Sequence, residues 1–241
     1  MFPSTLPIGE PELMRASAFR RHLAEETRAD ADPIGSRLST LSPSLLLDLM
    51  RFEQDGRNSG LLEVLAAAIR HARRLLLHLQ HRDRVLPLTI FPVEQLVHCP
   101  LPLPALLALP LDELEVLHVE PAALRPPGDR MHELVGEPAL YHPLPLLGWE
   151  IALRGPRSEL LPEIAGRAAY RVSPGAQLRQ LPLAGTLADA VARLKREATH
   201  VRDIARWPGF DDERARRLLN ALYLQAALIV SRTHPAATND G

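Results

Sequence analysis

The sequence predicts an α+β fold, in which N-terminal helices pack on a small antiparallel sheet and a three-helix unit follows at the C-terminal end. Three observations lead to this class. Residues 60–74 have the spacing of an amphipathic helix, residues 75–91 alternate like two paired strands, and residues 186–231 contain helix signals separated by a tight turn. A helix followed by a hairpin and a further strand is typical of a core in which helices cover an antiparallel sheet.

Helices are predicted in the first 74 residues. Pro11 can open a helix within residues 1–36, which we interpret either as a partly ordered N-terminal arm and linker or as an arm that packs on another subunit. Ser42 and Pro43 have the residue types of an N-cap and a first helical position, and they predict a second helix. The third helix, over 60–74, ends in basic residues that suit the helix dipole.

A β-hairpin is predicted directly after these helices. Its strands are the apolar runs 75–80 and 85–91, and the polar residues 81–84 form the turn. Pro87 has no N–H, which predicts that the second strand lies at a sheet edge or carries a bulge there. Residues 115–119 predict one further strand.

Proline and turn residues divide the chain. The turn-rich segment 120–145 predicts a boundary between an α+β domain (37–125) and a helical domain (140–232), with a disordered tail over 233–241. The proline-rich, apolar segment 100–111 has the composition of a surface patch that a dimer would cover.

The second half is predicted to begin with a helix over 146–154. A second, short helix is predicted within 158–164. Two strands, 168–175 and 177–183, are predicted around the turn residues Ser173, Pro174 and Gly175 before the C-terminal unit.

The C-terminal unit contains three predicted helices. Thr186 can cap the first, and the second runs from about Thr199 until Trp-Pro-Gly at 207–209 stops it, because proline disfavours helix before it and glycine tolerates a positive φ. Asp211 can cap the third, and residues 228–230 predict a short strand.

This order resembles the winged-helix family of helix-turn-helix domains over residues 186–231. The resemblance implies that the third helix occupies the recognition position in the DNA major groove. Its candidate nucleic-acid-binding residues are Arg214, Arg216, Arg217 and Asn220. The family's wing is a two-stranded hairpin after the third helix, whereas here Pro235 and a polar tail leave little room for a return strand. The acidic start of the third helix would also face phosphates unfavourably.

Composition narrows the class of protein. The apolar fraction of 46% and charged fraction of 24% are those of a globular protein, and a net charge of −1 gives no overall attraction to nucleic acid or membrane. Lys195 is the only lysine among many arginines, which indicates a GC-rich, bacterial genome. One cysteine, no apolar run that could span a membrane and no signal-peptide pattern predict a cytoplasmic protein.

No catalytic or cofactor motif is present in the sequence. It contains no GxGxxG, no GxxxxGK[ST] and no GxSxG, so we expect no cofactor and assign no catalytic residue. Several histidines surround the single cysteine, but no pair has a recognised metal-ligand spacing, and no metal ligand is assigned. These residues are His71, His78, His81, His98, Cys99 and His118.

The sequence leaves three functional hypotheses. The first is a non-enzymatic bacterial regulatory or signalling adaptor that binds a protein partner or self-associates as a homodimer, with Tyr141, Trp149 and Trp207 as interface candidates. Core packing of the 146–154 helix is the alternative role for such aromatics. The second is a DNA-binding transcriptional regulator, and the third is a metal-dependent hydrolase built from the histidine-rich middle region.

Overall fold

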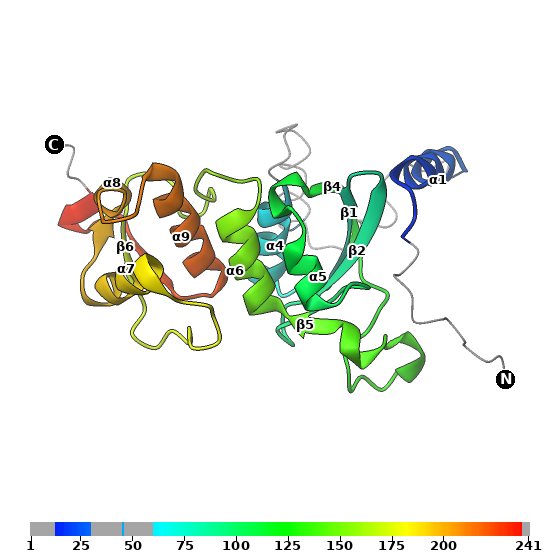
Figure 1. Ribbon diagram of the computed structural model, residues 1–241. Helices are drawn as coiled ribbons and strands as arrows, with labels where there is room; N and C mark the ends of the chain where they lie inside the picture. Colours follow the sequence, from blue (N-terminus) through cyan, green and yellow to red (C-terminus); the bar gives the residue numbers. More distant parts are fainter. Residues whose placement is uncertain (1–12, 30–44, 46–59, 238–241) are drawn as a thin grey trace.

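The computed structural model describes residues 13–29, 45 and 60–237, and its helices and two antiparallel sheets confirm the predicted α+β class (Figure 1). The larger sheet has the strand order β4-β1-β2-β3-β5 and the smaller one β7-β6-β8. The helix predicted at Pro43 lies outside the described residues, apart from the buried Leu45.

The larger sheet contains the predicted hairpin. Its turn is made by residues 82 and 83, and Arg82 has a positive φ of 56°. The strand predicted at 115–119 is also present, and it pairs with the other side of β1. The five strands are β1 (Leu75–His81), β2 (Arg84–Phe91), β3 (Leu96–His98), β4 (Glu115–Pro121) and β5 (Tyr141–Pro143).

Pro87 lies in an inner strand that pairs with β1 without a bulge, so both predicted alternatives, an edge strand and a bulge, were wrong. Val85 donates its N–H to the Met14 carbonyl (2.8 Å), on the side of β2 away from β1. The nitrogen of Pro87, two residues later, points the same way. β3 pairs with β2 only from Thr89 onward, so no described strand requires an N–H from Pro87.

Helix α4 (Gly60–Arg70) is central to the molecule. Every residue from Leu61 to Ala68 is buried, including Glu63. This differs from the predicted amphipathic helix because α4 contacts β4 on one side and both α6 (Leu144–Arg154) and α9 (Asp212–Leu224) on the other. Figure 1 shows α4 and α6 between the larger sheet and the C-terminal helices.

The segment 100–111 does not form an exposed apolar patch. It contains the short helix α5 (Leu103–Ala108), whose Leu106 is buried, and Leu111 is buried beyond it. Leu101, Leu107 and Leu109 are partly buried against the same core. The leucines therefore pack inward, and no dimer is needed to cover them.

Helix α1 (Ala16–Ala29) lies at the end of the molecule remote from the C-terminal unit (Figure 1). Ala16 and Phe19 form a small separate hydrophobic cluster with Val85, and Arg20 donates to Gln80 (2.6 Å). The predicted arm thus contains a helix that packs on the hairpin of its own chain.

The smaller sheet completes the C-terminal unit with a strand from earlier in the chain. β6 pairs antiparallel with both β7 and β8, so the strand that β8 appeared to lack comes from before α7. Residues 177–183 form no strand, and residues 158–164 form no helix but an irregular segment that ends in a turn at 162–164. The elements are β6 (Ala169–Val172), α7 (Gly185–Arg196), β7 (Thr199–His200), α8 (Val201–Ile204), α9 and β8 (Leu228–Ser231).

The two halves share one hydrophobic core. It runs from Leu77 of the larger sheet through Trp149 of α6 to Leu218 of α9.

β5 belongs to the larger sheet and leads directly into α6, so the sheet extends beyond residue 125, where the α+β domain was predicted to end. Pro235–Ala237 form a 3-10 helix in which Ala237 is buried, so the disordered tail predicted from residue 233 does not begin there. No described helix has the length and apolar character needed to cross a membrane.

Candidate functional site

Helix α9, the predicted recognition helix, begins as the sequence predicts. The Asp211 side chain accepts the N–H of Arg214 (2.7 Å), and Asp212 and Glu213 occupy the first turn, where the helix dipole favours negative charge. Gly209 has a φ of 75°, and a Cβ there would come within 2.9 Å of Thr186 Cγ2. Glycine therefore suits the turn before α9, because a side chain there would strain the backbone and press on the Thr186 side chain.

Asn220 is fully buried, so its predicted role as an outward base-reading residue is corrected. Its Oδ1 accepts the N–H of Leu161 (2.9 Å), and its Nδ2 donates to the carbonyl of Glu159 (2.8 Å). Both groups belong to the segment that follows α6. The Asn220 side chain thus supplies hydrogen-bond partners to backbone groups of an irregular segment that no helix or strand provides.

Asn220→Ala is expected to lower the free energy of unfolding by about 1–3 kcal/mol, because it leaves the buried N–H of Leu161 without a partner and removes the part-buried hydrogen bond to the carbonyl of Glu159. Urea denaturation measures this. The matched control on α9 is Arg216→Ala, whose expected cost is below about 0.5 kcal/mol, since it removes one long surface contact. Equal costs for the two variants would contradict the structural role of Asn220.

Arg217 is also used within the protein. Its side chain is 15% exposed, and Nη1 donates to the carbonyls of Gly155 (2.7 Å) and Leu153 (3.3 Å) at the end of α6. Nε pairs with Glu213 (2.7 Å). The predicted nucleic-acid contact is corrected, because this guanidinium caps α6 and joins it to α9.

Arg214 and Arg216 do reach the surface. Arg216 makes a 3.5 Å contact with Glu159. Arg214 donates to the carbonyl of Gly209 (2.5 Å) and to Thr186 Oγ1 (2.9 Å). The Thr186 hydroxyl therefore accepts a hydrogen bond from Arg214 and does not cap α7 as predicted. Helix α7 starts one residue earlier, and no side chain caps its N-terminus.

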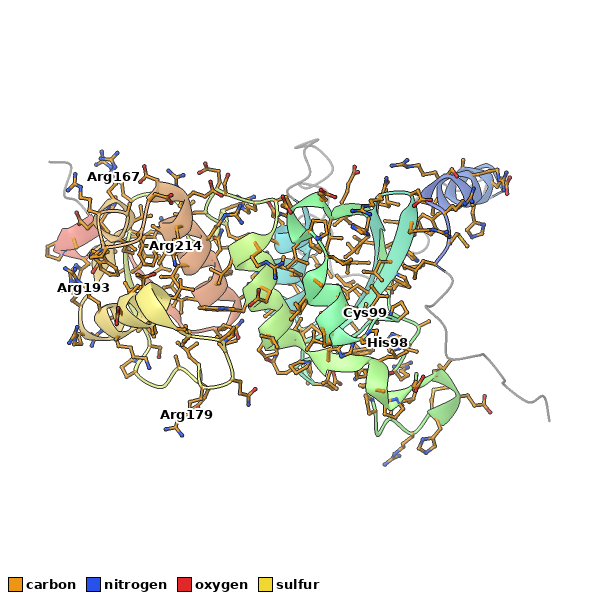
Figure 2. The ribbon with its side chains drawn as sticks, viewed as in Figure 1. His98, Cys99, Arg167, Arg179, Arg193 and Arg214 are labelled. Carbon is orange, nitrogen blue, oxygen red and sulfur yellow. The ribbon has the colours of Figure 1, made fainter. Side chains whose placement is uncertain are left out.

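A cluster that the sequence did not predict surrounds the turn between α8 and α9. Its arginines are exposed, whereas Trp207 is only 8% exposed, so the prediction of Trp207 as an interface residue is corrected to a buried position beneath Arg193. The Arg193 guanidinium lies 4.6 Å from the centre of the Trp207 ring, and that of Arg214 lies 5.1 Å from the Phe210 ring. The two rings meet edge to face at 6.4 Å. Such pairs are favourable cation–π contacts. We call Arg193, Trp207, Phe210 and Arg214 the arginine–aromatic cluster; Figure 2 labels its two arginines on the C-terminal unit.

The other two aromatic candidates also make their contacts within the protein, Trp149 in the core and Tyr141 at a half-buried position. Trp149 is fully buried, so its prediction as an interface residue is corrected to core packing. The Tyr141 hydroxyl donates to the carbonyl of Arg125 (2.5 Å) and accepts the N–H of Gly136 (2.9 Å), and its ring contacts His98. Tyr141 thereby holds the 125–136 loop against the larger sheet.

The histidines of the middle region do not converge with Cys99. His78 and His118 are neighbours on β1 and β4, and burial lowers the pKa of His78. Burial, with a smaller contribution from His142, lowers the pKa of His98. Burial raises the pKa of Cys99 to about 11, which makes its thiol a poor nucleophile at neutral pH. Among the described residues no three His, Cys, Asp or Glu side chains are placed to hold a metal ion.

Charge is distributed unevenly between the two halves. Residues 144–237 contain fourteen arginine and lysine residues against nine aspartate and glutamate residues, an excess of five positive charges. The net charge of −1 for the whole chain hides this excess. Counting charge by segment could have revealed it from the sequence.

Comparison with known proteins gives no family for this chain. No protein-family model, curated protein or solved structure matches it.

Proposed function

We propose that this protein is a non-enzymatic bacterial regulatory or signalling adaptor that acts through protein–protein contacts of a winged-helix-like C-terminal unit. The main support is the arginine–aromatic cluster, in which the exposed Arg193 and Arg214 are held over aromatic rings, since arginine is enriched among the residues that dominate binding energy at interfaces. Its guanidinium groups and the positive excess of this half favour an acidic partner surface.

Two observations support a winged-helix-like unit in a protein-contact role. The order α7, β7, α8, α9, β8 with β6 beside β8 has the elements of that family, although one strand precedes the helices. The residues that DNA reading would need are engaged elsewhere, since Asn220 is buried and Arg217 caps α6. A helix-turn-helix shape serves both purposes in proteins, so the side chains decide between them.

The test is a charge reversal in the cluster. We expect the protein to capture a partner from an extract, and Arg193→Glu to weaken binding of that purified partner at least about tenfold. Lys195→Glu makes the same charge change on the same helix outside the cluster and should leave affinity within about threefold. The proposal fails if no partner is retained, or if both variants lose affinity equally.

DNA binding is the second candidate, favoured by the positive excess and by the strand β6 that completes the sheet. Electrophoretic shifts with duplex DNA at increasing salt test it. Affinity that falls steeply with salt, and is reduced in Arg214→Ala and Arg216→Ala, would support DNA binding over the adaptor proposal.

A further inference from the structure

A pocket of about 890 Å³ opens on the C-terminal unit, apart from the arginine–aromatic cluster. Three segments that are distant in the sequence form it. They are residues 159–167 between α6 and β6, residues 200–202 at the start of α8, and Arg216 of α9. The volume lies within the range of about 300–1,000 Å³ typical of small-molecule sites. We call it the arginine pocket.

Cationic side chains predominate in the lining of the pocket. Arg167, Arg202 and Arg216 line it together with His200, and Glu159 is the one acidic residue among the lining residues. The Glu159 side chain is 69% exposed and lies 3.5 Å from Arg216, so solvent weakens that pair. Guanidinium groups stay charged at every physiological pH, and their planar forks match phosphate oxygens in two-point hydrogen bonds.

The pocket wall is held in place by the core. The Tyr170 hydroxyl donates to the carbonyl of Ile164 (2.6 Å), and Arg232 Nη1 donates to that of Ala165 (2.9 Å). Asn220 holds the backbone at 159 and 161. A wall fixed before binding lowers the entropy cost of forming a complex.

His200 adds a hydrogen-bond donor. Its Nδ1 accepts the N–H of Arg202 (3.2 Å), so in the neutral ring the proton lies on Nε2. The lining therefore combines fixed positive charge with an N–H donor. Leu160 and Val201 supply apolar surface for the group that carries the anion.

We propose that the arginine pocket binds a phosphate monoester. The ester is supplied either by a phosphorylated side chain of a protein partner or by a small phosphorylated metabolite. This inference does not depend on the proposed adaptor function, because none of the cluster residues lines the pocket.

Isothermal titration with free phosphoserine and with a short phosphoserine peptide tests the proposal in the full chain. Both probes should bind, and Arg167→Gln or Arg202→Gln should weaken binding at least about tenfold. Arg179→Gln is the matched control, since Arg179 is exposed and lies well away from Arg167 (Figure 2). The unphosphorylated peptide should not bind.

Amide NMR shifts provide a second readout that does not depend on a variant. Phosphoserine should shift the signals of residues 166–167 and 200–202 in the unmodified protein. Tighter binding of the phosphopeptide than of phosphoserine would identify a protein partner, and equal binding a small metabolite. No binding, shifts outside the pocket, or equal loss in Arg179→Gln would overturn the proposal. Loss of partner capture with retained phosphate binding would reject the adaptor function alone.

Discussion

Trp149→Ala is expected to lower the free energy of unfolding by about 3–5 kcal/mol, since it empties the largest fully buried side chain from the core between the two halves. Trp149 lies on α6, which packs against both α4 and α9, so neighbouring helices cannot close the cavity without moving relative to one another. Thermal and urea denaturation of the full chain measure the loss.

Trp149→Phe distinguishes the effect of the lost side-chain volume on stability from the effect of the buried N–H group. The Trp149 Nε1 has no hydrogen-bond partner among the described residues, so phenylalanine removes an unpaired buried donor while keeping most of the ring. We expect a cost below about 2 kcal/mol for this variant. A small effect of Trp149→Ala, below about 1 kcal/mol, would instead favour the exposed, partner-binding role that the sequence suggested.

Local signals explain why parts of the fold could be predicted. The 75–91 hairpin, the Asp211 cap and the Gly209 turn depend on residues within a few positions of one another. Periodicity and capping rules describe such short-range contacts directly.

Long-range pairings explain what the sequence did not reveal. β6 joins β8 across nearly sixty residues, and Arg217 donates to Gly155 on another helix. Hydrophobic period indicates which face of a helix is apolar, but not which element covers the opposite face. The third helix therefore seemed to present Arg217 and Asn220 to solvent, whereas α6 and the segment after it occupy that side.

The arginine pocket and the arginine–aromatic cluster were missed for the same reason. Arg167, Arg202 and Arg216 come from separate segments, and only folding brings them to one cavity. Trp207 and Phe210 were visible in sequence, but the guanidinium groups over their rings come from different helices. The one signal that the sequence offered for them was the excess of positive charge in the second half, which appears when charges are counted by segment.

Arg157→Met is expected to lower the free energy of unfolding by about 3–5 kcal/mol, because it leaves the Glu63 carboxylate buried without its ion-pair partner. Glu63 lies on the fully enclosed part of α4. Arg157 also donates to the carbonyls of Glu159 (2.8 Å) and Leu160 (2.5 Å), so it shapes the segment that Asn220 holds from the other side.

The double variant Glu63→Leu/Arg157→Met separates two costs of Arg157→Met: the loss of the hydrogen bonds that Arg157 makes, and the burial of an unpaired Glu63 carboxylate. Removing the carboxylate abolishes the penalty of an unpaired buried ion, whereas the contacts of Arg157 to the 159–160 carbonyls stay lost. We therefore expect the double variant to be more stable than Arg157→Met by at least about 1 kcal/mol, while remaining less stable than the unmodified protein. Urea denaturation of both variants at neutral pH measures the difference. Equal stability of the single and double variants would contradict this expectation. It would mean that water reaches the Glu63 carboxylate once Arg157 is removed, so the contact between α4 and the second half would be open to solvent.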